Sequence, residues 1–186
     1  STRMAITKAS RDQIVSDLID RAKVFQGGGG ERFELILVAK VEAAARASLD
    51  RLFPNFQSAD DNRWASVINR AKNGDEAALS AVDWTETPET HPICSAVLSE
   101  VGSGKRGKDV RDALEASPYG WPRDAVDAAL ITLHTTSHLI ATHKGMTLSQ
   151  GQLDQAKISV TDFRAATVTI PPKDKIKLRK LFQAAG

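Results

Sequence analysis

The stretch EVGSGKRGKDVRD, residues 100–112, has a glycine and lysine spacing that could bind a nucleotide phosphate. Gly102, Gly107 and Lys108 match most of a phosphate-binding loop, which also needs a buried strand before it and Ser or Thr directly after the lysine. Asp109 takes that last place, where its carboxylate would repel phosphates. The preceding HPICSAVLSEV has helical periodicity. We therefore predict that the glycines end one helix before another begins, and that no ATP binds here.

Two histidines, His134 and His138, have the four-residue spacing of a zinc-binding helix. The pair lacks the glutamate that acts as general base in metalloproteases with this spacing. His143 and Cys94 could complete a site only through the tertiary fold, and histidines near a helix C-terminus also suit the helix dipole. No nucleophile–base spacing occurs elsewhere. We therefore predict no catalytic residue, no metal and no cofactor, and a chain that is not an enzyme.

Basic residues gather around the glycine-containing stretch and predict contact with a partner. Asp109 and Asp112 interleave with them, and Asp124 and Asp127 lie at the start of the next helix, where carboxylates repel phosphates. Contact with duplex DNA and contact with another protein therefore stay open as alternatives. The residues predicted to bind nucleic acid or a partner are Lys105, Arg106, Lys108, Arg111, Arg123 and Lys144.

Composition excludes several classes of protein. The 186 residues include 25 basic and 23 acidic side chains, so the net charge of +2 gives no bulk attraction for nucleic acid. One cysteine allows no internal disulfide, as in a reducing compartment, and we expect the cytoplasm. No run of about 18 apolar residues predicts a membrane span. The start STRMAI and the end FQAAG favour a piece of a longer protein.

Apolar periodicity predicts a mainly α-helical protein. The four-glycine run Gly27–Gly30 ends the first helix, either as a break or as a flexible hinge. Strands at 139–142 and 146–148 can pair around Lys144-Gly145. The predicted helices cover residues 10–25, 41–53, 62–74, 75–82, 92–101, 108–116 and 122–138, with a weaker one at 152–158 and a last one after Pro172.

The order of helix, short helix, turn, longer helix and hairpin is typical of a winged helix-turn-helix. We therefore predict a helical domain over 1–88 and a winged-helix-like domain with a short β-hairpin wing over 89–150. A C-terminal extension over 151–186 carries an extended segment, ATVTI, and the terminal helix.

The piece SPYGWPRDAVDAAL begins a helix in an unusual way. Tyr119 and Trp121 can fold back over the helix start like a staple, Gly120 supplies a permissive backbone between them, and Pro122 suits a first helical residue. Trp121 is then either a buried staple or an exposed contact for a partner, and a Trp121→Ala variant distinguishes the two.

This piece resembles the C-terminal region of the large P-loop ATPase of BREX phage-defence systems, the BrxC/PglY family. The resemblance extends to ARASLDRLFPNF, to HPICSAVLSEVGSGKRGKDVRDALEASPYGWPRDAVDAAL and to TDFRAATVTIPPKDKIKLRKLF, and so covers most of residues 40–182. It implies a non-catalytic module of a much larger intracellular protein, whose ATP-binding loop lies in another part of the chain. The partners it implies are phage DNA or other subunits of a defence complex, and no membrane.

A free-standing transcription regulator of the winged-helix type is the alternative. Such a regulator is expected to be a symmetric dimer that reads paired half-sites. The near-neutral charge and the acidic start of the 122–138 helix count against it.

Overall fold

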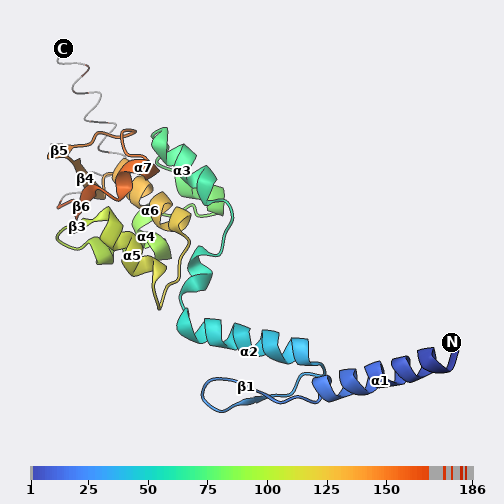
Figure 1. Ribbon diagram of the computed structural model, residues 1–186. Helices are drawn as coiled ribbons and strands as arrows, with labels where there is room; N and C mark the ends of the chain where they lie inside the picture. The colour runs from blue at the N-terminus through green and yellow to red at the C-terminus, as the bar shows by residue number, and fades with distance from the viewer. Residues whose placement is uncertain (1, 168–173, 175–176, 178–180, 182, 184–186) are drawn as a thin grey trace. The chain divides into compact units, whose positions relative to one another are not determined.

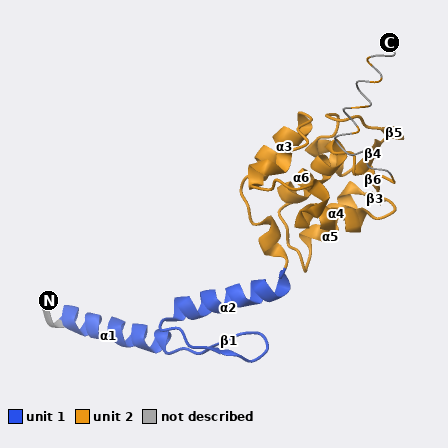
Figure 2. Cartoon of the chain, turned by 180° about the vertical axis from the view of Figure 1, so that it is seen from behind, with its two compact units in different colours: residues 1–54 blue, residues 55–186 orange. Residues whose placement is uncertain are grey.

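The computed structural model describes residues 2–167, 174, 177, 181 and 183 (Figure 1). The chain divides into two compact units, an N-terminal unit of residues 1–54 and a C-terminal unit of residues 55–186 (Figure 2). The division falls at Pro54 rather than near residue 88, because the helix at 64–72 packs within the C-terminal unit. The fold is mainly helical, as predicted, and it also contains two small antiparallel sheets.

The N-terminal unit consists of two helices joined by a hairpin. Its elements are α1 (Thr2–Asp20), β1 (Val24–Phe25), β2 (Glu31–Arg32) and α2 (Leu37–Leu52). The first helix ends earlier than predicted, because the four-glycine run is the turn of a hairpin and not the end of a helix. Gln26 N–H donates to the Gly30 carbonyl at 2.8 Å, and Gly28 and Gly29 have φ values of 110° and 91° that favour glycine.

The C-terminal unit is built around α6 (Arg123–Thr135). Every residue of this helix from Ala125 to Thr135 is buried, including the polar residues Asp127, Thr132, His134 and Thr135. The helices α3, α4 and α5 all pack against it (Figure 1). The other helical elements of this unit are η1 (Phe56–Ala59), α3 (Trp64–Lys72), η2 (Ala78–Val82), η3 (Pro88–Thr90), α4 (Pro92–Val101), α5 (Gly107–Glu115) and α7 (Gln155–Ile158).

A four-stranded antiparallel sheet completes this unit, in the order β3-β6-β4-β5. Its strands are β3 (Lys105–Arg106), β4 (Leu139–His143), β5 (Met146–Thr147) and β6 (Thr161–Ala165). The predicted hairpin is confirmed, since β4 pairs with β5 across a turn in which Lys144 and Gly145 have φ values of 51° and 80°.

The sequence did not predict β3 or β6. The central strand β6 precedes the predicted extended segment 166–170, of which residues 168–170 lie outside the described residues. The predicted terminal helix also lies outside them, except for Asp174, Lys177, Leu181 and Gln183, which are helical. Across the described part of the chain, no helix has the length and apolar character needed to cross a membrane.

Candidate interaction surfaces

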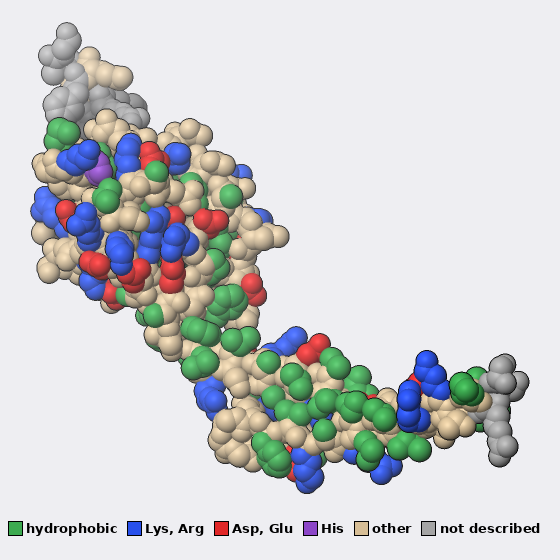
Figure 3. Space-filling view, viewed as in Figure 1, with side chains coloured by type: hydrophobic (Ala, Val, Ile, Leu, Met, Phe, Trp, Pro, Cys, Tyr) green, Lys and Arg blue, Asp and Glu red, His purple; other side chains and the backbone are tan. Residues whose placement is uncertain are grey.

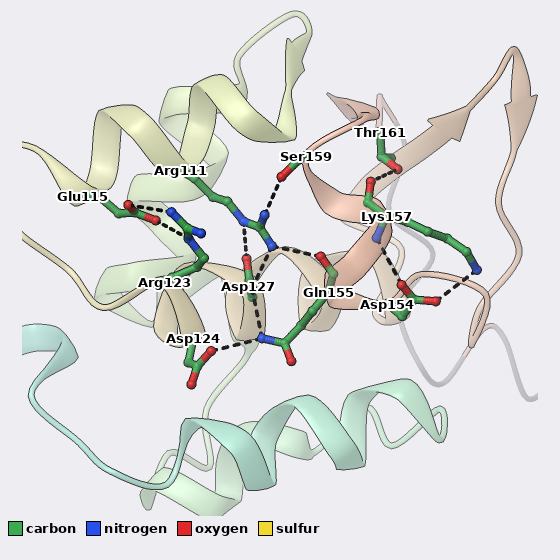
Figure 4. Close-up of polar contacts among 10 residues, drawn as sticks. All are labelled: Arg111, Glu115, Arg123, Asp124, Asp127, Asp154, Gln155, Lys157, Ser159 and Thr161. Atoms are coloured by element: carbon green, nitrogen blue, oxygen red, sulfur yellow. Dashed lines mark hydrogen bonds and ion pairs between the residues drawn. The ribbon is translucent and has the colours of Figure 1, made fainter.

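Three of the six predicted contact residues, the half-buried Lys105 and the exposed Lys108 and Arg123, are already paired with a carboxylate on the same unit. Lys105 pairs with Glu100, and Lys108 pairs with Asp112 one turn along α5. Arg123 Nε donates to Glu115 Oε1 at 2.8 Å (Figure 4). These charges are largely neutralised within the chain, so any phosphate would have to compete with a nearby carboxylate.

Arg111 is a correction to the predicted surface, because it lies inside the protein. Its Nε and one terminal nitrogen donate to the two carboxylate oxygens of Asp127 at 2.7 and 2.8 Å, and further bonds reach Ser159 Oγ at 2.6 Å and the Gln155 carbonyl at 3.0 Å (Figure 4). Asp127 is completely buried, which raises its pKa against the opposing effect of the Arg111 guanidinium. Arg111 therefore joins α5, α6 and α7 and is not available to a partner.

The Tyr119–Pro122 motif lies between α5 and α6. Trp121 is buried, and its Nε1 donates to the Asn55 carbonyl at 2.8 Å. The Tyr119 ring lies against it with a centroid distance of 4.6 Å, and Gly120 has a φ of 64° between the two rings. Pro122 directly precedes α6 as its N-cap. The motif therefore closes the α5–α6 connection and ties it to the start of the C-terminal unit.

The two histidines with zinc-like spacing do not converge. His134 is buried with Nδ1 and Nε2 at 3.2 and 3.3 Å from the carbonyls of Leu139 and Ser149. His138 Nε2 lies 3.0 Å from a carboxylate oxygen of Glu89 instead. No cluster of three metal-ligating side chains occurs among the described residues. The polar partners of His134 and His138 are therefore those of structural residues.

Two predicted contact residues, Arg106 and Lys144, are exposed, and their side chains make no hydrogen bond or ion pair with any residue that the structure describes. A third free basic residue, Arg164, was missed by the sequence analysis because β6 was not predicted. Arg106 lies on β3 and Arg164 on β6, and both line a pocket of about 360 Å³ at the surface. In Figure 3, Lys and Arg side chains interleave with Asp and Glu on the face that carries α5 and the sheet.

A second surface, made of apolar side chains, lies on the N-terminal unit. Every buried apolar side chain of the described residues lies between Ala59 and Phe163, so residues 4–54 bury none. The exposed large apolar side chains of the described residues fall within 4–52, apart from Met146, Val160 and Leu181. Figure 3 shows hydrophobic side chains along the N-terminal unit. They include Phe33 and Leu35, which are 84% and 91% exposed.

Polar contacts hold this unit together in place of a core. Lys40 is its single buried residue among those whose side chains are described, and its Nζ donates to the carbonyls of Asp20 and Ala22 at 2.7 and 2.9 Å. Leu37 N–H donates to the Asp20 carboxylate at 3.2 Å. A lysine on the last carbonyls of a helix is favourable for the helix dipole. These contacts fix the end of α1 on the start of α2 and leave the apolar faces uncovered.

No protein-family model, curated protein or solved structure matches this chain.

Proposed function

We propose that this chain is a non-catalytic protein-binding module, and that its N-terminal unit packs onto a helical surface of another protein. The observation that carries the proposal is the absence of any buried apolar side chain in residues 4–54. Large contiguous apolar surfaces are uncommon on monomeric proteins and mark interaction sites. Two helices and a two-stranded hairpin without a core are at best marginally stable alone.

An exposed apolar stripe on α2 indicates what kind of surface the partner presents. Its exposed residues Val38, Val41, Ala45, Leu49 and Leu52 are spaced by three or four positions and so lie on one side of the helix. Such spacing is what one helix presents when it packs against another. The small side chain of Ala45 at the middle of the stripe allows close approach. The occupant we propose is therefore an amphipathic helix of a second protein.

The family resemblance supports placing this module in the C-terminal region of the large ATPase of a phage-defence system, where the partner is another subunit or another part of the parent protein. The order of elements from α4 to β6 in the C-terminal unit supports a winged-helix-like arrangement. Its elements run in the order α4, β3, α5, α6, β4 and then β6, and β6 pairs between β3 and β4. In that arrangement β6 is the returning wing strand, and β5 is an addition at the sheet edge.

The burial of α6 argues against the alternative, a free-standing regulator that reads DNA. A recognition helix needs an exposed side that can enter the major groove. Here the residues from Ala125 to Thr135 are all buried, and α3 covers α6 from a part of the chain that precedes the winged-helix-like region. Only Arg123 and Asp124 at its start are exposed, and Arg123 is paired with Glu115.

The test is hydrogen exchange on the full chain, alone and in the assembly purified from cells that carry its tagged gene. We expect amides of residues 4–54 to exchange quickly in the isolated chain and to be protected in the assembly. The Leu49→Asp variant should abolish co-purification of the partner. Arg46→Asp adds a carboxylate to the same helix outside the stripe and should leave the partner bound.

Equal protection of residues 4–54 in the isolated chain and in the assembly would refute the proposal. Self-association of the isolated chain in sedimentation equilibrium, abolished by Leu49→Asp, would instead identify a second copy as the occupant.

A further inference from the structure

The exposed face of the four-stranded sheet carries side chains that no sequence motif brings together. Side chains alternate between the two faces of a strand, and Phe163 of β6 points inward and is buried. Asp162 and Arg164 therefore share the outer face. Arg106 is opposite Asp162 in the register of β3 with β6, and Thr142 is opposite Asp162 on the other side. This outer face is independent of the apolar stripe on the N-terminal unit.

Two guanidinium groups on this face are free to bind an anion. Arg106 and Arg164 are exposed and make no ion pair or side-chain hydrogen bond with any described residue. They are diagonal neighbours on adjacent antiparallel strands, whose Cα positions lie about 7–8 Å apart. Two long side chains at that separation can reach one phosphate group or two consecutive ones. The planar guanidinium fork matches phosphate oxygens in geometry and charge.

The pocket between them is open to solvent. Continuing the register of β3 with β6 by one residue brings Gly104 across from Arg164, and glycine has no side chain to fill the space beside the arginine. Hydroxyls of Ser103 and Thr142 line the same pocket, with a volume of about 360 Å³. Asp162 is the one carboxylate in the lining, so the pocket keeps an excess of positive charge.

We propose that this sheet face binds the phosphate backbone of duplex DNA through Arg106 and Arg164, without reading its sequence. Proteins that bind single strands stack bases on exposed aromatic side chains. The pocket lining contains one aromatic residue, Phe163, and it is buried beneath the face. Contacts to phosphates alone position a duplex and carry no sequence information. The surface differs from the predicted one at the start of α5, with which it shares Arg106.

The test is fluorescence anisotropy with the full chain and labelled DNA of random sequence, as a duplex and as a single strand, over a salt series. The log of the association constant falls with log salt by about 0.9 for each duplex phosphate contacted. The double variant Arg106→Ala/Arg164→Ala should therefore lose affinity more than tenfold at low salt and lower the slope by about 1.8. Circular dichroism checks that the variant is folded.

Two single variants make the test specific to this face. Asp162→Asn removes a carboxylate that repels the DNA phosphates. It should tighten duplex binding by roughly two- to fivefold, which corresponds to the free energy typical of an exposed charge–charge interaction. Lys108→Ala removes an exposed cation that is already paired with Asp112, and should change affinity by less than about twofold.

Three outcomes would overturn the proposal. One is the absence of duplex binding at low salt, and another is preference for the single strand. The third is binding that the double variant leaves unchanged while Lys108→Ala weakens it, which would return the contact to the start of α5. Because the Leu49→Asp variant leaves the sheet intact, it should bind duplex DNA normally whether or not the protein-binding proposal holds.

Discussion

Replacing Arg111 by methionine should destabilise the C-terminal unit by about 3–5 kcal/mol, the usual effect of removing one partner of a buried ion pair. Methionine keeps the length and apolar character of the arginine stem, so little packing is lost. The loss arises at Asp127, which is completely buried and would keep only the 3.0 Å bond from Gln155. Removing the charge on both sides, with Arg111→Met/Asp127→Leu, should recover most of the stability.

The assay is urea unfolding followed by circular dichroism, with the free energy of unfolding compared at equal slope. Lys108→Met is the matched control, because it breaks an ion pair on the same helix whose two side chains are 64% and 55% exposed. We expect no resolvable change in that variant. The reasoning is refuted if Arg111→Met costs less than about 1 kcal/mol, or if the two variants are equally destabilised.

The pH dependence gives a second readout of the same pair. Without Arg111, the opposing effect of the guanidinium is lost while burial remains, so the pKa of Asp127 rises further above the value in the unfolded chain. A carboxyl with a raised folded-state pKa contributes stability at low pH that is lost as pH rises through that pKa. The Arg111→Met variant should therefore recover part of its lost stability, relative to wild type, as pH falls from 7 toward 5.

Further predictions concern single sites in the C-terminal unit. Gly107→Ala should destabilise strongly, because a Cβ there would lie 2.1 Å from the Ile158 carbonyl oxygen; thermal unfolding measures this, and an unchanged midpoint would contradict it. Trp121→Ala should cost roughly 3–5 kcal/mol in urea unfolding, as other large-to-small core changes do, whereas a loss under about 1 kcal/mol would contradict a core role. The Nδ1 of His91 accepts a hydrogen bond from Ile93 N–H, and burial lowers the pKa of this histidine. The contribution of His91 to stability should therefore be constant above about pH 6.5 and fall as pH drops through the lowered pKa. His91→Asn keeps a capping acceptor without titrating in this range, and unfolding curves from pH 7 to 5 should show a flatter profile.

Local sequence patterns correctly predicted the helices and turns that are determined by residues close together in the sequence. The helix at 92–101 has the bounds expected from Pro92 and the glycines after Val101, and the β4–β5 hairpin forms around Lys144 and Gly145. Trp121 is buried, which is one of the two placements that the motif allowed. These features depend on turn chemistry and helical periodicity, both of which act over a few residues.

Such local patterns could not predict contacts between residues that are far apart in the sequence. The pairing of Lys105 with Phe163 is needed to recognise β3 as a strand, and no local signal marks it. The ion pairs of the basic cluster have a shorter range, since Glu100 is five residues from Lys105 and Glu115 is eight from Arg123, but the turns between the partners decide whether the side chains meet. Arg111 did carry a usable signal, because it falls on the buried stripe of α5 beside Val110 and Leu114.

The position of β6 in the sheet has a consequence for synthesis on the ribosome. β6, which lies between β3 and β4 in the sheet, is the last of the four strands to be synthesised. Its residue Phe163 pairs with Lys105 of β3, so 58 further residues must be added to the chain after Lys105 before the two can pair. At about 5–20 residues per second, β3 waits roughly 3–12 s for its partner. During that interval β3 and β4 both present open edges, which are the sites where strands of different chains associate. A nascent chain stalled before Thr161 should therefore depend on chaperones more than one stalled after Ala165.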